Sequence, residues 1–384
     1  MSKVPGYSET FFRNKIKFLQ NEGFDVILFV DEKDKGFDLC PVVEGFPNSK
    51  GLVNRLIVVL RLILRIVVGS HSVFRLWTFN RRDGFKIGQN VLSIINSVHI
   101  LRYSLDWLHF GFAALSVNRE NLAGVIDAKL AVSIRGYDIN VFPLKHPGIY
   151  DLLWKRLNKL HYISEALLDR AIELGFRLDC PHQKIRPAID INLFKQQVNQ
   201  GLIKGHTIRF TTVARLNWIK GLNYVLEALE FLKIYGIKFQ YNIIGEGSEY
   251  ENLIFMRNQL ALNDDVVFLG MLSPTQIKQN LENTDIYIQY SLEEGFCNAV
   301  LEAQAMGCLC VVSDAGGLSE NVLDRVTGFV VGKRNSKLLA EKIIDVIYMS
   351  DEVKSKVREM AVTRVKDEFN LRQQQISFLQ FYTS

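Results

Sequence analysis

The segment EGFCNAVLE places two carboxylates, Glu294 and Glu302, eight positions apart in the last third of the chain. Gly295 permits a close approach of the backbone to a ligand. The amides from Phe296 to Val300 would form a helix N-terminus, which favours an anion. If the helix begins near Gly295, Glu302 lies roughly 8 Å along it at 1.5 Å per residue. One carboxylate on the loop and one on the helix would then flank the anion, and carboxylates accept hydrogen bonds well from sugar hydroxyls.

Other chemically suitable segments fall at the ends of predicted strands in the same half of the chain. In ARLNWIKG, Arg215 directly follows a predicted strand and Lys220 stands at the start of the next helix. A guanidinium, an ammonium and a helix N-terminus at one point predict an anion site. GEGSEY begins at Gly245 like a phosphate-binding loop but lacks the third glycine of G-x-G-x-x-G, so a tight turn is favoured for it alone. DAGG (314–317) is either a close backbone approach to a ligand or a plain loop.

The elements that must position these residues can be read from hydrophobic periodicity. From about residue 207, β-branched apolar runs alternate with helical patterns, which predicts a parallel sheet covered on both faces. Ligands of such sheets bind at the carboxyl ends of the strands. The predicted strands are 207–214, 239–245, 266–270, 285–290, 309–313 and 328–331, and the predicted helices are 221–233, 248–260, 274–283 and 336–348.

The N-terminal half also reads as α/β, although its pattern is less regular. It contains a predicted helix at 8–23 and predicted strands at 25–30 and 128–134. The polar stretch 195–205 is the expected hinge. A final predicted helix, 370–382, follows the last α/β unit and has the length to cross back onto the first domain.

Length and composition set limits on the kind of protein. A chain of 384 residues predicts two domains, and 48% apolar with 23% charged residues is ordinary globular composition. The net charge of +5 gives no argument for nucleic acid, but it fits anionic substrates or a phosphate-rich membrane surface. The N-terminus has no apolar core of signal-peptide length. Five cysteines without a Cys-x-x-Cys predict neither a disulfide framework nor a zinc site and favour a reducing compartment.

The most apolar segment, Leu52–Val68, admits two interpretations. Arg55, Arg61 and Arg65 interrupt it, and it is too short to span a hydrocarbon layer of roughly 30 Å. It is either a helix packed within its domain with arginines at the rim, or a helix lying on an anionic membrane surface.

Taken together, ARLNWIKG, IIGEGSE, VVFLG, EGFCNAVLEAQAMG and SDAGGLSENV resemble, in order and spacing, the donor domain of family-4 glycosyltransferases. PGYSETFF, DWLHFGFAA, VSIRGYDI, HYISEAL and KIRPAIDINLF resemble the subgroup that builds exopolysaccharide, colanic acid or lipopolysaccharide outer core. The resemblance implies a GT-B fold: two Rossmann-like domains with parallel sheets facing a central cleft, and a C-terminal helix that crosses back to the first domain. The implied domains are 1–198 for the acceptor, 199–366 for the nucleotide-sugar donor and 367–384 for that helix.

The resemblance also implies roles for single residues. Arg215 and Lys220 would hold the donor diphosphate, Glu294 would contact the transferred sugar, and Glu302 would accept hydrogen bonds from the ribose. Further implied donor-binding residues are Gly245, Gly270, Met271, Leu272, Gly295, Phe296, Cys297, Asn298, Ala299 and Val300. Implied acceptor-side residues are Gly6, His109, Arg135, Gly136 and Asp138.

The chain departs from the family pattern at three places. Arg135 stands where many relatives have histidine, so a histidine role near the donor sugar does not transfer, and Arg135 would instead pair with phosphate. Cys297 stands where relatives often have proline or glycine. Only MSKV precedes Pro5-Gly6, so the usual first strand is short or the start is truncated.

The resemblance therefore implies a retaining glycosyltransferase that moves a hexose-type sugar from a UDP- or GDP-linked donor to a glycan or lipid-linked acceptor in cell-surface polysaccharide biosynthesis. Arg215, Lys220 and Glu294 are the expected catalytic residues. No cofactor and no metal are expected, in agreement with the lack of an Asp-x-Asp motif. A cytoplasmic protein is expected, at the inner face of the plasma membrane if the 52–68 helix binds lipid. The alternatives are a non-catalytic nucleotide-sugar-binding subunit and a GT-B nucleotide-sugar epimerase.

Overall fold

The computed structural model describes residues 10–31, 36–45, 65, 67, 69–195 and 207–383. The chain divides into two compact units, Met1–Ile185 with Gln375–Ser384 and Arg186–Gln374. The predicted boundary at residue 198 and almost all of the predicted hinge 195–205 lie outside the described residues, as do Gly6 and most of the 52–68 segment. Within the described part of the chain, no helix is long and apolar enough to cross a membrane.

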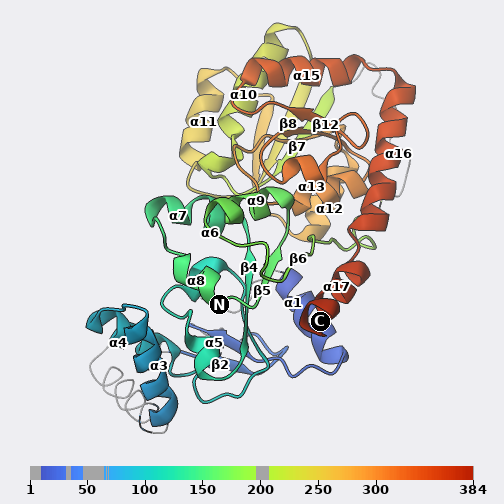
Figure 1. The fold of residues 1–384 in the computed structure, drawn as a ribbon. Coiled ribbons are helices and arrows are strands. Elements are labelled where there is room, and N and C mark those ends of the chain that lie inside the picture. The colour runs from blue at the N-terminus through green and yellow to red at the C-terminus, as the bar shows by residue number, and fades with distance from the viewer. Residues whose placement is uncertain are drawn as a thin grey trace. The chain divides into compact units, whose positions relative to one another are not determined.

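The C-terminal unit is built on one six-stranded sheet in which every neighbouring pair is parallel (Figure 1). The strand order is β12-β11-β10-β7-β8-β9. A strand was predicted at each of these places, with ends that differ by one residue at most. The strands are β7 (Ile208–Val213), β8 (Phe239–Ile244), β9 (Val266–Gly270), β10 (Ile286–Gln289), β11 (Leu309–Ser313) and β12 (Phe329–Val331).

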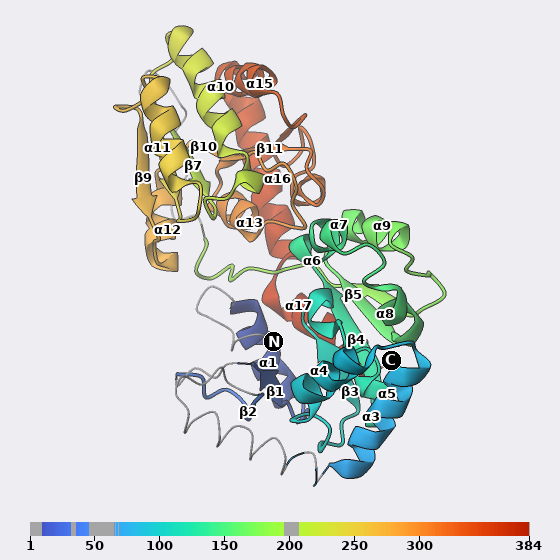
Figure 2. The same cartoon turned by 90° about the vertical axis from the view of Figure 1, so that its left-hand side faces the viewer.

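Helices connect these strands, as a parallel sheet requires. Local sequence explains several of their starts: Ser273 caps α12 reciprocally with Gln276, and Pro274 occupies its first position. The helix α10 packs against α15, and α13 packs against α16 (Figure 2). The helical elements are η2 (Trp218–Lys220), α10 (Leu222–Ile234), α11 (Tyr250–Gln259), α12 (Pro274–Glu282), α13 (Asn298–Ala305), α14 (Leu318–Asn321), α15 (Ser336–Tyr348) and α16 (Asp351–Glu368).

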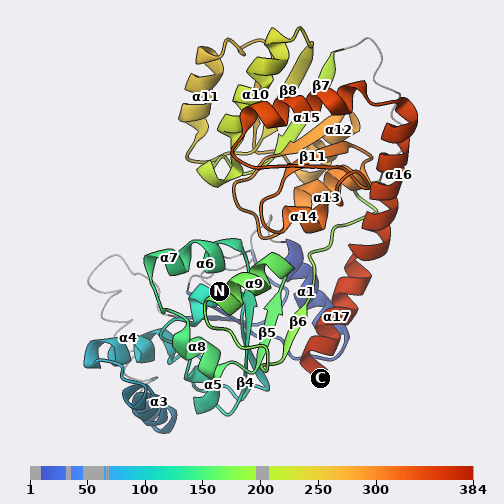
Figure 3. The same ribbon diagram turned by 45° about the horizontal axis from the view of Figure 1, so that its top comes forward.

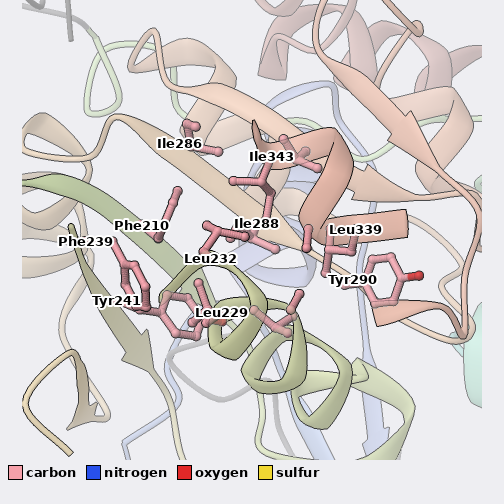
Figure 4. Close-up of a cluster of buried hydrophobic side chains, with 14 of the residues drawn as sticks. Phe210, Leu229, Leu232, Phe239, Tyr241, Ile286, Ile288, Tyr290, Leu339 and Ile343 are labelled. Atoms are coloured by element: carbon pink, nitrogen blue, oxygen red, sulfur yellow. The ribbon is translucent and has the colours of Figure 1, made fainter. Parts of the chain in front are cut away.

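A buried apolar cluster fixes one face of this sheet (Figure 4). Alternate residues of β10, Ile286 and Ile288, join Leu339 and Ile343 of α15 in the cluster. Because successive strand residues point to opposite faces, the side chain of Tyr287 points away from this cluster. Each large side chain that is fully buried here stabilises the fold by about 1.5–3 kcal/mol, so the register of β10 is firmly set.

The described residues of the N-terminal unit form two parallel sheets. The larger has the order β3-β4-β5-β6, and the smaller pairs β1 with β2. The predicted strand 25–30 is reduced to β1, and the predicted helix 8–23 is described as α1. The strands are β1 (Leu28–Val30), β2 (Val42–Glu44), β3 (Trp107–Phe110), β4 (Lys129–Ile134), β5 (Lys159–Tyr162) and β6 (His182–Lys184). The helical elements are α1 (Thr10–Asn21), α3 (Ser70–Arg82), α4 (Ile87–Ser97), η1 (Ala113–Ser116), α5 (Leu122–Val125), α6 (Gly136–Asn140), α7 (Phe142–Lys145), α8 (Asp151–Arg156) and α9 (Glu165–Glu173).

The C-terminal helix α17 (Leu371–Thr383) ends in the N-terminal unit, to which residues from Gln375 onward belong (Figure 3). Phe378 and Phe381 are fully buried and cluster with Ala131 of β4. The indole Nε1 of Trp107 donates to the carbonyl oxygen of Tyr382 at 3.2 Å. The final turns of the helix are therefore part of the N-terminal core.

Candidate active site

The strand order of the C-terminal sheet identifies one crevice for a ligand. The chain passes from β7 to β8 on one side, whereas the strand on the other side of β7 is β10. Loops leave such neighbouring strands in opposite directions, and ligands of open parallel sheets bind at the carboxyl ends of the strands where the order reverses. The loop after β7 carries Arg215 and Lys220, and the loop after β10 carries Glu294.

Lys220 and Glu294 form an ion pair at this point, Nζ to Oε2, with both side chains only 14% exposed. Burial acts to lower the pKa of Lys220, but the charge of Glu294 and their hydrogen bond outweigh it, so the pKa is raised above its ordinary value. The ammonium therefore stays protonated. The predicted anion-binding cation and the predicted sugar-binding carboxylate are thus brought into direct contact.

Arg215 is exposed, and its guanidinium makes no ion pair or hydrogen bond to any of the described residues. Its charge acts to lower the pKa of Lys220, so the two cations lie close together. Glu294 neutralises Lys220, whereas Arg215 has no carboxylate partner among the described residues. The crevice therefore keeps a positive charge that favours an anionic ligand.

Gly221 locks the loop after β7 onto the loop after β10. It has φ +61°, and a Cβ there would lie 2.2 Å from the carbonyl oxygen of Tyr290. The amide of Leu292 donates to the carbonyl oxygen of Ile219 at 2.7 Å. Only glycine fits this contact, and it places Lys220 opposite Glu294.

A series of hydrogen bonds leads from Tyr287 in β10 to the carboxylate of Glu294. The hydroxyl of Tyr287 donates to Gln289 Oε1 at 3.0 Å, and Gln289 Nε2 donates to Ser291 Oγ at 3.0 Å. Ser291 Oγ in turn donates to Glu294 Oε2 at 3.2 Å. The Tyr287 hydroxyl also lies 3.3 Å from the Val213 carbonyl oxygen, an alternative acceptor for its single proton, and it accepts from the Val213 amide at 3.3 Å. Ser291 holds the carboxylate from the protein side, and no motif in the sequence marked Tyr287, Gln289 or Ser291.

The short helix α14 braces the EGFC loop at two points. At its start, the amide of Gly317 donates to the carbonyl oxygen of Glu294 at 2.8 Å, and a Cβ at Gly316 would lie 2.5 Å from the same oxygen. At its end, Asn321 accepts from the Cys297 amide through Oδ1 and donates to the Cys297 carbonyl through Nδ2, both at 3.0 Å. The DAGG segment therefore supports the Glu294 loop, a role that its sequence did not reveal.

The helix α13 begins at Asn298, with Cys297 as its N-cap. The expectation that the amides from Phe296 to Val300 form one N-terminus is corrected at Cys297, because its amide is bonded to Asn321. The first turn, Asn298–Val300, forms the N-terminus of α13. Burial and the nearby Glu294 raise the pKa of the Cys297 thiol to about 12, so this thiol stays neutral.

Glu302 lies on α13, one turn beyond Asn298, and its carboxylate has no hydrogen-bond partner among the described residues. Burial raises its pKa to about 7. The two carboxylates of the opening motif therefore differ: Glu294 faces a cation, whereas Glu302 is held without one. A ligand that donates hydroxyl groups would stabilise the ionised form of Glu302.

The remaining predicted donor-side residues fall around the same edge. Gly245, after β8, donates its amide to the carbonyl oxygen of Gly270, the last residue of β9, at 2.8 Å. Met271 and Leu272 follow directly, and Met271 is 76% exposed. Phe296 points away from the crevice, since its buried ring packs on Phe369 with centroids 5.7 Å apart.

The described acceptor-side residues lie in the N-terminal unit. Asp138 accepts from the Ala113 amide at 2.8 Å and from the Arg135 amide at 2.9 Å, which caps α6 and ties it to η1. Burial raises the pKa of Asp138 to about 6. The Arg135 guanidinium lies over the rings of Phe12 and Phe112, at 5.2 and 5.6 Å. Gly136 opens α6.

His109 belongs to a buried relay. His161 Nε2 donates to the carbonyl oxygen of Ile185 at 3.1 Å, which leaves Nδ1 to accept from Ser133 Oγ at 2.7 Å. Ser133 Oγ then accepts from His109 Nε2 at 2.8 Å, and His109 Nδ1 accepts from the Tyr382 hydroxyl. Burial lowers the pKa of both histidines well below the ordinary value, so both are neutral. His109 thus holds α17 to the sheet.

Among the residues that the structure describes, no three His, Cys, Asp or Glu side chains come together as metal ligands.

Sequence comparisons give the family. Residues 194–363 match the family described as "Glycosyl transferases group 1". A Campylobacter jejuni protein, N,N'-diacetylbacillosaminyl-diphospho-undecaprenol alpha-1,3-N-acetylgalactosaminyltransferase, is 34% identical over a match that covers 66% of this chain and 72% of that protein. The chain belongs to the group 1 glycosyl transferases.

Two further relatives match at lower sequence identity. The amylovoran biosynthesis glycosyltransferase AmsK of Erwinia amylovora is 27% identical, with 96% of this chain and 94% of that protein covered. The putative colanic acid biosynthesis glycosyltransferase WcaL of Salmonella typhimurium is also 27% identical, and the match covers 68% of this chain and 66% of that protein, just under two thirds of its length.

Two solved structures have a fold similar to that of this chain. HepE of Anabaena, solved with UDP and glucose, is similar over 100% of both chains with a TM-score of 0.71 and 18% identity. Sucrose-phosphate synthase of Thermosynechococcus elongatus is similar over 98% of this chain and 93% of that one, with a TM-score of 0.74 and 14% identity. The α/β class is confirmed by the parallel sheets, and the GT-B fold by these neighbours.

We expect Asn321→Ala to lower the free energy of unfolding by about 2–4 kcal/mol, because it leaves the buried amide and carbonyl of Cys297 without partners. Hydrogen exchange should rise locally over residues 294–300. Ser319→Ala on the same helix, where the hydroxyl is exposed, is the matched control and should stay within about 0.5 kcal/mol. Equal effects of the two substitutions would contradict the brace.

We expect Glu302→Gln to become more stable relative to the wild type as pH rises. The folded pKa of Glu302, about 7, lies above its ordinary value of 4.5, so the folded state holds an extra proton between these values. The stability of the wild type therefore falls as pH rises through this window, and glutamine does not titrate. The difference in Tm between the two proteins, measured at about pH 5 and about pH 8, should grow. A constant difference would show that Glu302 is solvated.

Proposed function

We propose that the protein is a retaining glycosyltransferase that moves a hexose-type sugar from a UDP- or GDP-linked donor to a glycan or lipid-linked acceptor in cell-surface polysaccharide biosynthesis. The observation that carries the proposal is the Lys220–Glu294 pair at the carboxyl edge of the sheet, beside the first turn of α13. This crevice combines cations and backbone amides for a diphosphate with a fixed carboxylate for sugar hydroxyls.

The main chemical task is to stabilise the diphosphate that leaves. Arg215 and Lys220 and the N-terminal amides of α13 supply fixed positive charge where the negative charge develops, so little reorganisation is needed during the reaction. Loss of one such donor typically costs about 3–4 kcal/mol of transition-state stabilisation. In this proposal no metal is required for the charge.

Glu294 holds the transferred sugar through its hydroxyls. Its carboxylate is paired with Lys220 and accepts from Ser291, so it is held in place. The bond from the anomeric carbon to the diphosphate breaks, and the acceptor oxygen attacks the same face through an oxocarbenium-like state. The acceptor proton passes to a donor phosphate oxygen. Glu302 accepts hydrogen bonds from the ribose.

Relatives support the donor and product classes. HepE is described in complex with UDP and glucose. AmsK and WcaL are described as amylovoran and colanic acid biosynthesis glycosyltransferases. These descriptions favour a polysaccharide product and make UDP the first nucleotide to test. A cytoplasmic protein that meets an anionic membrane through residues 52–68 fits a lipid-linked acceptor, and this contact stays a prediction.

Lys220→Ala should lower kcat/KM by about 10²-fold or more, since the leaving diphosphate loses a buried cation. Lys220→Arg should retain more activity because it keeps the charge. The control is Lys278→Ala, which removes the lysine of an i,i+4 pair on α12 and should leave the rate unchanged. Release of UDP or GDP from the donor gives the rate. A rate for Lys220→Ala equal to that of the wild type would remove Lys220 from the site.

A thermal-shift screen with UDP, GDP, ADP and their sugars should identify the donor, because a ligand that binds the folded state raises Tm. We expect the largest shift with a UDP- or GDP-sugar, and a smaller shift for the same ligand with Glu302→Ala. Turnover of that donor with a glycan acceptor would then separate a transferase from a binding subunit. Binding without turnover in any acceptor preparation would contradict the proposed catalysis.

A further inference from the structure

A cavity lies in the C-terminal unit, and neither Lys220 nor Glu294 lines it. Its volume is about 280 Å³, and its walls come from η2, the start of α10, α11 and Leu292. Trp218 lines it and is 57% exposed, although a tryptophan is usually largely buried. The proposed reaction leaves this cavity unused.

The polar side chains that line the cavity have spare hydrogen-bonding capacity. Asn217 uses Oδ1 to cap η2 through the Ile219 amide, which leaves its NH₂ group to donate. Glu249 accepts one hydrogen bond from Asn252 at 3.1 Å, which leaves acceptor positions on both side chains. The Asn223 side chain and the Trp218 indole N–H have no hydrogen-bond partner in the described part of the chain. Donors and acceptors therefore surround an aromatic side chain.

This combination selects a neutral polyhydroxylated ligand. The described residues that line the cavity include no lysine or arginine, so they offer no positive charge to hold a phosphate. The single carboxylate, Glu249, is shared with Asn252 and is a weak site for a cation. Amide and carboxylate side chains match adjacent sugar hydroxyls. The aromatic side chain of Trp218, with Met256 and Leu253 nearby, offers apolar surface for the carbon face of a sugar ring.

The cavity is also joined to the donor loops. Asn217 and Trp218 belong to the same ARLNWIKG loop as Lys220, and Leu292 lies two residues before Glu294. The Leu292 amide donates to the Ile219 carbonyl at 2.7 Å, so the two loops that carry the ion pair form one wall. A ligand in the cavity would contact the back of both loops.

We propose that this cavity is a saccharide-binding subsite, with Trp218 as its aromatic platform, that holds a sugar residue of a neutral glycan chain. That this chain is the polysaccharide being extended rests on the proposed function, whereas the binding itself does not. A subsite here keeps the polymer on the enzyme between transfers and raises its local concentration.

The sequence provides a direct reporter for this proposal. It contains four tryptophans, and Trp77, Trp107 and Trp154 belong to the N-terminal unit, so Trp218 alone reports on the cavity. In protein labelled with 5-fluorotryptophan, the Trp218 resonance is assigned by its loss in Trp218→Phe. Titration with maltotriose, cellotriose and β-1,4-galactotriose, each to about 20 mM, covers affinities expected for one sugar subsite.

At least one trisaccharide should shift the Trp218 resonance and leave the three other resonances unchanged. Asn252→Ala should weaken that trisaccharide about tenfold, as expected for lost hydrogen bonds, and Asn263→Ala, an exposed change beyond α11, should not. Saturation transfer to the sugar should be kept in Trp218→Phe, which retains an aromatic ring, and lost in Trp218→Ala.

Failure of all the trisaccharides to shift Trp218 overturns the subsite even if the enzyme transfers sugar. A shift by uridine monophosphate that Asn252→Ala weakens would instead assign the cavity to the nucleoside and also overturn it. Equal shifts of all four resonances would indicate non-specific binding, with the same consequence. If the trisaccharide binds as expected but no donor is ever turned over, the subsite stands and the proposed function fails.

Discussion

Two contacts between a glycine and a backbone carbonyl control the geometry of the C-terminal site. Gly221 meets the carbonyl oxygen of Tyr290, and Gly316 meets that of Glu294, at separations where any Cβ would clash. Both glycines have positive φ, which other residues rarely adopt. These contacts bring the loops after β7, β10 and β11 together. Lys220 and Glu294 can form a buried pair only because the two loops approach this closely.

The same close approach creates two different environments for two carboxylates. Glu294 faces an ammonium and receives a hydroxyl hydrogen bond, so its negative charge is balanced. Glu302, on the helix, is desolvated without a cation, and its pKa rises to about 7. Different environments usually give two carboxylates different roles. Here Glu294, which is paired with a cation, fits a contact for a sugar, and Glu302 fits a contact whose charge depends on the bound ligand.

The sequence predicted most of the C-terminal unit because its signals are local. Strands with continuous apolar runs and helices with a clear apolar face were placed to within about two residues, and the motif residues followed at strand ends. The supports of the site escaped prediction for a physical reason. In the sequence, Tyr287 and Gln289 look like ordinary strand residues. Their contribution comes from hydrogen bonds that lead to Ser291 and Glu294 in the loop after the strand. Asn321 depends on a partner 24 residues distant, so no local pattern marks it.

Cys297 contributes to the site through its backbone contacts with Asn321, and these contacts depend on which residue stands at position 297. Its thiol is neutral and buried, and its contribution is made by its backbone, which is extended with φ −121° and bonded to Asn321 through both the amide and the carbonyl. Proline, which the resemblance places here in many relatives, has no N–H and a φ near −65°. It would leave Asn321 Oδ1 buried without a donor and would rotate the loop. A chain with proline at position 297 therefore needs another way to hold the end of α14 against the loop that carries Glu294.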